Sequence, residues 1–294
     1  MSHTIRAATP ADEPALRTLY HDAFDAPKAE LDRFFGARFV PEQTRVLCAD
    51  ERLCAALYLL PGEVVCAGER FSADYIYAAA TEKSQRGQGL MRDLLAGLSS
   101  RADLLVLAPA DAGLFSYYEK QGFRTAFYRK ELTLPRRVLA MIAGEDKPAA
   151  IVSRYAEEYL PALHTLRDTL FSRTDGFRWP LDGLGYALLD HNVTGRTLIV
   201  TEEGTPAAYV LLEEEGDAAY ISECVLGRVT FVTMVAALLG ESAAETFHFR
   251  LPPDFPLSAD GFVLRPIGML RALTAEGTRA THHLRGAYLG LTLD

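Results

Sequence analysis

The stretch "SQRGQGLMRDLL", residues 84–95, places two glycines directly before an apolar helical pattern. The preceding run "ADYIYAAAT", residues 73–81, is typical of a strand, and leucines recur on one face of the helix expected after the glycines. The predicted order is therefore strand, glycine-rich turn, helix. Such a turn either directs backbone N–H groups at an anion such as a phosphate or only begins the helix.

Two familiar phosphate loops do not fit this turn. A dinucleotide-binding GxGxxG sequence needs a third glycine where Arg92 stands. A P-loop needs a lysine followed by serine or threonine after its last glycine. The local pattern thus leaves two alternatives, a cradle for another phosphate and a plain helix start.

The composition is that of an ordinary soluble globular protein, and 294 residues favour two domains. A net charge of −9 argues against a nucleic-acid partner. No run approaches the roughly 20 apolar residues of a membrane helix, and the first residues lack the apolar segment of a signal peptide. We therefore expect no membrane partner and a cytoplasmic location. The four cysteines show no close CxxC spacing, so we expect buried thiols and no metal site.

Two segments recur at an offset of about half the chain. Residues 13–24, "EPALRTLYHDAF", match residues 160–171, "LPALHTLRDTLF", at six of twelve positions. Residues 46–60 match residues 198–212 at five of fifteen positions. Two matches in the same order suggest a duplicated α/β domain, since solenoid repeats are only 20 to 50 residues long. The segment "MIAGEDKPAA", residues 141–150, has the composition of a linker, so the predicted domains are residues 1–145 and 150–294.

The first half resembles the GNAT superfamily of acyl-CoA-dependent acyltransferases over roughly residues 1–135. The resemblance depends on "YAAAT", "RGQGLMRDLL", the expected strand "DLLVLAP" and "LFSYYEKQGF", taken together and in this order. Members of the superfamily carry an R/Q-x-x-G-x-G/A turn, and here Arg86, Gly89 and Met91 occupy its positions. A more distant likeness is to the enhanced-intracellular-survival type of aminoglycoside acetyltransferase. The implied fold class is α/β, with tandem GNAT-like domains that each have a mixed, mostly antiparallel central sheet flanked by helices.

The resemblance also implies where acetyl-CoA binds. The turn would hold the pyrophosphate of coenzyme A, and the end of the preceding strand would run alongside its pantetheine arm. The residues implied in coenzyme binding are Ala79, Ala80, Thr81, Arg86, Gly87, Gln88, Gly89, Leu90 and Met91. The sequence departs from the pattern at Met91, where many members have Gly or Ala. It also lacks the acidic residue that some members have on the preceding strand, where only Asp74 stands.

Tyr118 is the candidate general acid, because a phenol with a pKa of about 10 stays protonated at neutral pH and can protonate a departing thiolate. The alternative is that Tyr118 only packs, as we expect of Tyr117. The sequence supports the candidates for the general base less strongly than it supports Tyr118 as the acid. Asp294 is one, since the chain terminus reaches the active site in the aminoglycoside-acetylating relatives. Other candidates lie in the first helix and the loop after it, because that region usually borders the acceptor site in this superfamily: His21, Asp22, Asp25 and Glu30. The alternative for each is a solvated surface residue.

The second half contains no RxxGxG match, so we expect a GNAT-like domain without a coenzyme site. Its acidic run "LEEEGD", residues 212–217, is most simply a solvated hairpin turn, and Trp179 suits either a binding cleft or a core. The predicted function is N-acetyl transfer from acetyl-CoA to a primary amine of a small molecule or peptide by direct attack. The alternatives are a non-catalytic acyl-CoA-binding sensor, and an acyltransferase that uses another acyl group or an oxygen nucleophile. The sequence gives no indication of oligomeric state.

Overall fold

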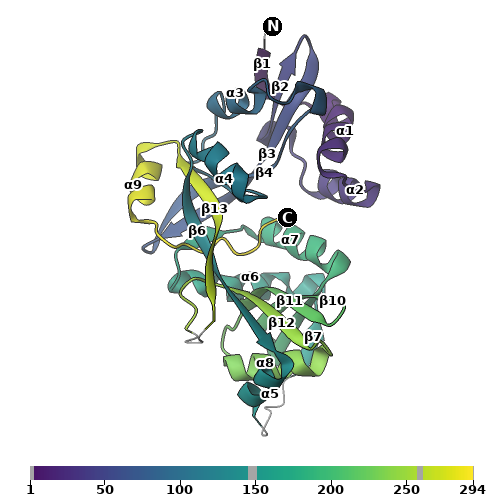
Figure 1. Ribbon diagram of the computed structural model, residues 1–294, viewed down its shortest axis with the longest axis vertical. Coiled ribbons are helices and arrows are strands. Elements are labelled where there is room, and N and C mark those ends of the chain that lie inside the picture. Colours follow the sequence, from purple (N-terminus) through teal and green to yellow (C-terminus); the bar gives the residue numbers. More distant parts are fainter. Residues whose placement is uncertain (1–2, 145–150, 257–260, 294) are drawn as a thin grey trace. The chain divides into compact units, whose positions relative to one another are not determined.

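The chain folds into two units, and each unit contains segments that are distant in the sequence (Figure 1). The computed structural model describes residues 3–144, 151–256 and 261–293, with the backbone alone for 151–153. The first unit comprises residues 1–63, 71–125 and 269–282, and the second comprises residues 64–70, 126–268 and 283–294. The predicted boundary at residues 145–150 lies outside the described residues.

The sheet of the first unit takes its strands from both ends of the chain. They are β1 His3–Ala7, β2 Thr44–Ala49, β3 Arg52–Cys66, β4 Glu69–Thr81, β5 Leu104–Leu107 and the end of β13 Val263–Ala272, in the order β1-β2-β3-β4-β5-β13. β1, β2 and β3 pair antiparallel, whereas β4 and β5 run parallel because α3, Leu90–Ala96, crosses between them. Residues Met269–Ala272 of β13 complete the sheet antiparallel to β5.

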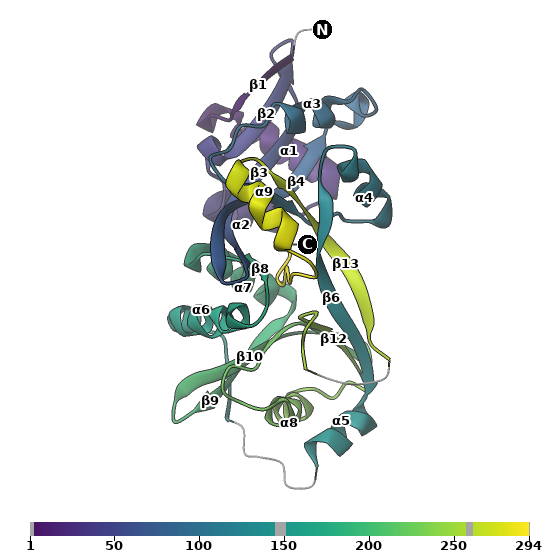
Figure 2. The ribbon, with the colours of Figure 1, turned by 90° about the vertical axis from the view of Figure 1, so that its left-hand side faces the viewer.

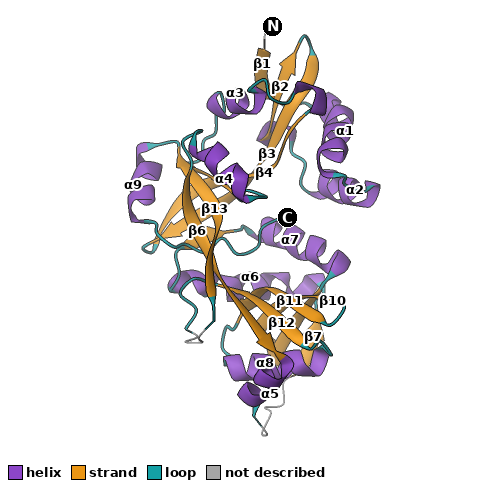
Figure 3. Cartoon of the chain, in the orientation of Figure 1, coloured by secondary structure: helices purple, strands orange, loops and turns teal. Residues whose placement is uncertain are grey.

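Helices lie on both faces of this first sheet (Figures 1 and 3). Helices α1 Glu13–Phe24 and α2 Lys28–Ala37 lie on one side, and α3 lies on the other. The burial pattern of β3 follows from this arrangement: Leu57 belongs to the core that includes α3, while Tyr58 packs against Phe34 of α2 with ring centroids 4.9 Å apart. A strand that is covered on both faces has a nearly continuous run of apolar residues, as "CAALYLL" in β3 does.

The second unit repeats the strand order of the first. Its strands are β6 Arg124–Pro135, β7 Ile151–Arg154, β9 Arg196–Glu202, β10 Thr205–Glu215, β11 Ala218–Val225 and β12 Thr246–Leu251, in the order β7-β9-β10-β11-β12-β6. The pairs are antiparallel except β11 with β12, which α8, Phe231–Glu241, connects. The predicted fold class, a mixed and mostly antiparallel sheet flanked by helices, is confirmed in each unit.

The helices of the second unit also form two layers around the sheet (Figure 2). Helices α5 Arg136–Ala143 and α8 cover one face, and their leucines share one core cluster with alternate residues of β9, β10 and β12. Helices α6 Leu160–Asp168 and α7 Leu181–Thr194 lie on the other face. Helix α6 and the hairpin of β9 and β10 are the segments that repeat α1 and the hairpin of β2 and β3.

The remaining predictions from composition concern the cysteines and the membrane. Cys48, Cys54, Cys66 and Cys224 are buried and free, as predicted. Within residues 3–144, 151–256 and 261–293, no helix has the length and apolar character needed to cross a membrane.

A buried ion pair joins α6 to β11 in the second unit. Arg167 and Glu223 are 1% and 0% exposed, and Arg167 Nε lies 3.2 Å from Glu223 Oε1. The hydroxyl groups of Tyr209 and Tyr288 both donate to Glu223, at 2.7 Å and 3.4 Å. Burial and the charge of Glu223 hold the pKa of both tyrosines well above the usual value. The network therefore brings a carboxylate, a guanidinium and two phenol groups into contact inside the core.

Replacing Glu223 by glutamine is expected to lower the free energy of unfolding by about 3–5 kcal/mol, because it leaves the Arg167 cation buried without its counter-charge. Urea unfolding measures the change. The double variant Arg167→Met, Glu223→Leu should recover part of the loss, since neither charge then remains, while the hydroxyl groups of Tyr209 and Tyr288 lose their acceptor. A single-variant loss below about 1 kcal/mol would show that water solvates Arg167 adequately.

Candidate active site

The glycine-rich turn joins β4 to α3 as the sequence predicts. β4 ends at Thr81, a short 3-10 turn covers Lys83–Gln85, and α3 begins at Leu90. Gly87 and Gly89 have φ angles of +79° and +82°, in the left-handed region that glycine adopts without strain. Both glycines are therefore required by the path of the backbone.

The surface of this turn is open at Gly87. A Cβ atom on Gly87 would meet nothing within 4 Å, and the side chains of Arg86 and Gln88 are exposed. Arg86 Nε donates to the backbone oxygen of Thr81 at 3.1 Å, which ties the turn to the end of β4. A guanidinium has five N–H donors, so the others remain able to bind an oxyanion. These features fit a pyrophosphate.

Strand β4 carries a local strain just before the turn. Ala78 has a φ angle of +46°, which is uncommon for a residue with a Cβ atom and marks an irregularity in the strand. Such irregularities redirect backbone groups and concentrate at functional sites. Ala79, Ala80 and Thr81 follow directly, and these are the residues implied to run alongside the pantetheine arm.

Tyr118 lies near the end of α4, Ala112–Glu119. It is 9% exposed, and its ring packs edge-on against the rings of Tyr117 and Phe123, with centroids 5.2 Å and 5.6 Å away. Burial raises the pKa of Tyr118 to about 12. The phenol therefore stays protonated throughout the physiological range.

One core cluster connects the predicted coenzyme residues with Tyr118. Leu90 and Tyr118 are buried members of this cluster, and Ala79 and Met91 pack against it. Met91, the departure from the family pattern, is therefore accommodated as an apolar packing residue. The structure brings the turn, the end of β4 and the candidate acid onto the same side of the first sheet.

The candidate bases differ in their surroundings. Asp294 lies outside the described residues. The ring Nδ1 of His21 is hydrogen-bonded with the backbone oxygen of Ala26 at 2.8 Å, and Asp22 and Asp25 are exposed. Asp74, the acidic residue at the edge of the strand, accepts a hydrogen bond from Ser100 at 2.5 Å. Glu30 is half-buried and accepts one from the hydroxyl of Tyr20.

Glu30 belongs to a hydrogen-bonded chain that sequence reasoning did not find. The Tyr20 hydroxyl lies 3.1 Å from Glu30 Oε1 and 2.7 Å from the hydroxyl of Tyr77. Because Tyr20 donates to Glu30, Tyr77 donates to Tyr20. The rings of Phe34 and Tyr58 pack around the two tyrosines. Tyr77 directly precedes the strained Ala78. This series of hydrogen bonds therefore connects β4 with a carboxylate on α2.

The connection from β11 to α8 in the second unit occupies the place that the glycine-rich turn has in the first. It has five residues, 226–230, whereas the turn from β4 to α3 has eight, 82–89. The hydroxyl of Thr230 accepts from the backbone N–H of Thr233 at 3.1 Å and so caps α8. A Cβ atom on Gly227 would lie 2.1 Å from the backbone oxygen of Ala207. This connection is therefore packed and capped where the first is open.

Comparison with known proteins concerns the same part of the chain. Residues 4–126 match the family model described as an acetyltransferase (GNAT) domain. The chain carries a GNAT acetyltransferase domain. The matched residues contain the turn, the strained β4 and Tyr118. Curated protein sequences gave no match to the chain.

Solved structures resemble nearly the whole chain. A probable N-acyltransferase from Enterococcus faecalis V583 has a TM-score of 0.74 at 18% identity, with 94% of this chain and 74% of that chain covered. A GCN5-related N-acetyltransferase from Kribbella flavida has a TM-score of 0.72 at 18% identity, covering 97% and 75%. Eis1 from Mycobacterium abscessus has a TM-score of 0.68 at 15% identity, covering 93% and 74%. At these identities the likeness shows a shared fold.

Proposed function

We propose that this protein is an N-acetyltransferase that transfers the acetyl group of acetyl-CoA to a primary amine of a small molecule or peptide. The observation that carries the proposal is the open turn of Arg86 to Gly89 directly after the strained β4, within a GNAT domain. The described residues of the second unit include no comparable turn, and we infer that this unit lacks a coenzyme site. One acetyl-CoA would then bind per chain.

Different residues of the first unit would carry out different steps of the reaction. Arg86 and the N–H groups of the turn would bind the pyrophosphate, and the backbone of Ala79–Thr81 would orient the acyl arm beside β4. The amine nitrogen attacks the thioester carbon, the C–N bond forms and the C–S bond breaks. Tyr118 donates its phenolic proton to the departing thiolate sulfur.

The attacking nitrogen must also lose a proton, and the chain of Tyr77, Tyr20 and Glu30 supplies a route. In this proposal the oxygen of Tyr77 accepts that proton, Tyr77 passes its own proton to Tyr20, and Tyr20 passes its proton to Glu30 Oε1. Glu30 is half-buried and releases the proton to solvent. The hydrogen-bonded geometry favours Glu30 over the exposed Asp22 and Asp25 as the final acceptor.

Glu30→Gln and Tyr77→Phe are each expected to lower kcat at least about tenfold, because either change interrupts the proton route. Acetyl-CoA affinity, measured by calorimetry, should stay unchanged. The double variant should be no slower than the slower single variant, since both residues act in one chain. Asp22→Asn, on the exposed side of α1, is the matched control and should retain wild-type kcat. Full activity of Tyr77→Phe would show that these hydrogen-bonded residues take no part in catalysis.

Release of free thiol from acetyl-CoA, assayed with a panel of amines and of alcohols, tests the function itself. Thiol release that depends on an amine acceptor is the expected result. Binding of acetyl-CoA without thiol release for any acceptor would favour the sensor alternative, and release with alcohols alone would favour an oxygen nucleophile. Mass spectrometry of the copurified coenzyme identifies the acyl group.

A further inference from the structure

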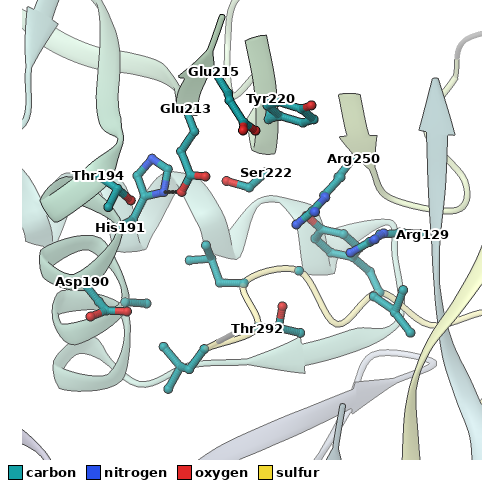
Figure 4. Close-up of a pocket in the computed structure, with 16 residues that line it drawn as sticks. Arg129, Asp190, His191, Thr194, Glu213, Glu215, Tyr220, Ser222, Arg250 and Thr292 are labelled. Atoms are coloured by element: carbon teal, nitrogen blue, oxygen red, sulfur yellow. Dashed lines mark ion pairs between the residues drawn. The ribbon is translucent and has the colours of Figure 1, made fainter. Parts of the chain in front are cut away.

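The second unit contains a polar cavity of about 420 Å³ (Figure 4). It lies on the face of the sheet next to α7, and Tyr288 and residues 290–293 near the end of the described chain line it as well. Its volume is within the range of small-molecule binding pockets. Neither the turn of the first unit nor Tyr118 contributes to it.

Opposite charges line opposite sides of this cavity. Glu213 and Glu215 of β10 and His191 of α7 lie on one side, and Arg129 of β6 and Arg250 of β12 lie on the other (Figure 4). His191 Nδ1 lies 3.2 Å from Glu213 Oε1 (Figure 4). Two regions of opposite sign therefore face each other across the cavity.

Ser222 provides an unsatisfied hydroxyl between these two regions. Its Oγ atom is buried and has no hydrogen-bond partner within the described part of the chain. The ladder between β10 and β11 pairs Leu211 with Glu223 and Leu212 with Ile221, so Ser222 is the extra residue of a bulge. Bulges redirect side chains, and a buried unpaired hydroxyl is unfavourable unless a ligand pairs with it.

The wall formed by the C-terminal segment is held firmly in place. Trp179, 1% exposed, donates from Nε1 to the backbone oxygen of Leu291 at 3.0 Å. A Cβ atom on Gly290 would lie 2.6 Å from Arg167 Nη2 and 2.9 Å from Glu223 Oε1, so this segment packs directly against the buried ion pair. Trp179 is thus a core residue, and the cavity is formed before any ligand arrives, which lowers the entropic penalty of binding.

We propose that this cavity binds a small zwitterion with an ammonium group and a carboxylate, as short peptides have. The ammonium group would lie against Glu213 and Glu215, and the carboxylate would lie against Arg129 and Arg250. Ser222 would hydrogen-bond to the polar groups between them. Arg129 also lies 2.7 Å from Glu131, which fixes its guanidinium at the rim. The proposal is independent of the acetyl-transfer chemistry of the first unit.

Calorimetry of the full-length protein with L-alanyl-L-alanine tests this proposal. The dipeptide should bind, and its N-acetyl derivative and its C-terminal amide should each bind at least about tenfold more weakly, because each lacks one of the two charges. Absence of dipeptide binding would overturn the proposal. So would equal affinity for the capped derivatives.

Variants locate the binding in this cavity. Ser222→Ala should weaken dipeptide binding about fivefold without lowering the thermal stability of the ligand-free protein, since the hydroxyl has no partner to lose. Glu213→Gln should weaken binding at least about tenfold. The matched control is Glu214→Gln on the same strand, whose carboxylate bonds with Ser242 and Arg196 outside the cavity and which should bind the dipeptide normally. Unchanged affinity in both Ser222→Ala and Glu213→Gln would overturn the proposed site.

Discussion

The double variant Arg86→Ala, Gly89→Val is expected to abolish acetyl-CoA binding while the chain stays folded. Gly89 has a φ angle of +82°, which a β-branched residue adopts only with strain. A Cβ atom there would also lie 2.7 Å from the Arg92 guanidinium. The turn must therefore move, and the charge of Arg86 is lost at the same time. We expect affinity to fall at least about 100-fold.

Calorimetric titration with acetyl-CoA measures this effect, and circular dichroism checks the fold. Gly68→Val is the matched control, because Gly68 has nearly the same φ angle, +81°, and lies in the turn between β3 and β4 with nothing within 4 Å of its Cβ position. It should bind acetyl-CoA normally. If the double variant binds as tightly as wild type, the turn is only the start of a helix.

Tyr118→Phe is expected to lower kcat by about 10²–10⁴ and to leave acetyl-CoA affinity unchanged. Phenylalanine keeps the ring that packs against Tyr117 and Phe123, so only the phenolic proton is removed. The raised pKa of Tyr118, about 12, gives a second expectation. The acid is active when protonated, so its contribution persists at neutral pH and is lost only as the pH rises toward 12.

Steady-state kinetics with a saturating amine separates this role from packing. Tyr117→Phe is the control, because Tyr117 is the adjacent, half-buried tyrosine on the same helix and should not affect turnover. Wild-type kcat in Tyr118→Phe would reject Tyr118 as the acid and leave it as a packing residue.

Local patterns in the sequence predicted much of this fold. The glycines at 87 and 89 specify positive φ angles, and the leucine spacing after them specifies the buried face of α3, so the strand, turn and helix follow from neighbouring residues. The two repeated segments fold as equivalent elements in the two units. The resemblance to a known family then supplied the proposed role of the turn, which the local pattern alone left open.

The parts that were not predicted depend on residues distant in the sequence. Tyr20 and Tyr77 meet because α1 packs against β4, and nothing in either local pattern marks them. The acidic run 212–217 does contain the hairpin turn, at Gly216, as predicted. Its Glu213 and Glu215 nevertheless line the cavity, because alternate residues of a strand share one face. An amphipathic pattern gives the period of an element but not the neighbour against which it packs.

Each half of the chain contributes a strand to the sheet of the other unit, and this affects when each unit can fold during synthesis. The first sheet ends with Met269–Ala272, and β6, from the first half, completes the second sheet. A nascent chain usually folds its N-terminal domain as soon as that domain leaves the ribosome. Here the first unit lacks its last strand until residue 272 has been synthesised. A premature stop in the second half before residue 269 would therefore leave the first sheet without its last strand, so a chain cut at the middle is not expected to yield a folded first unit.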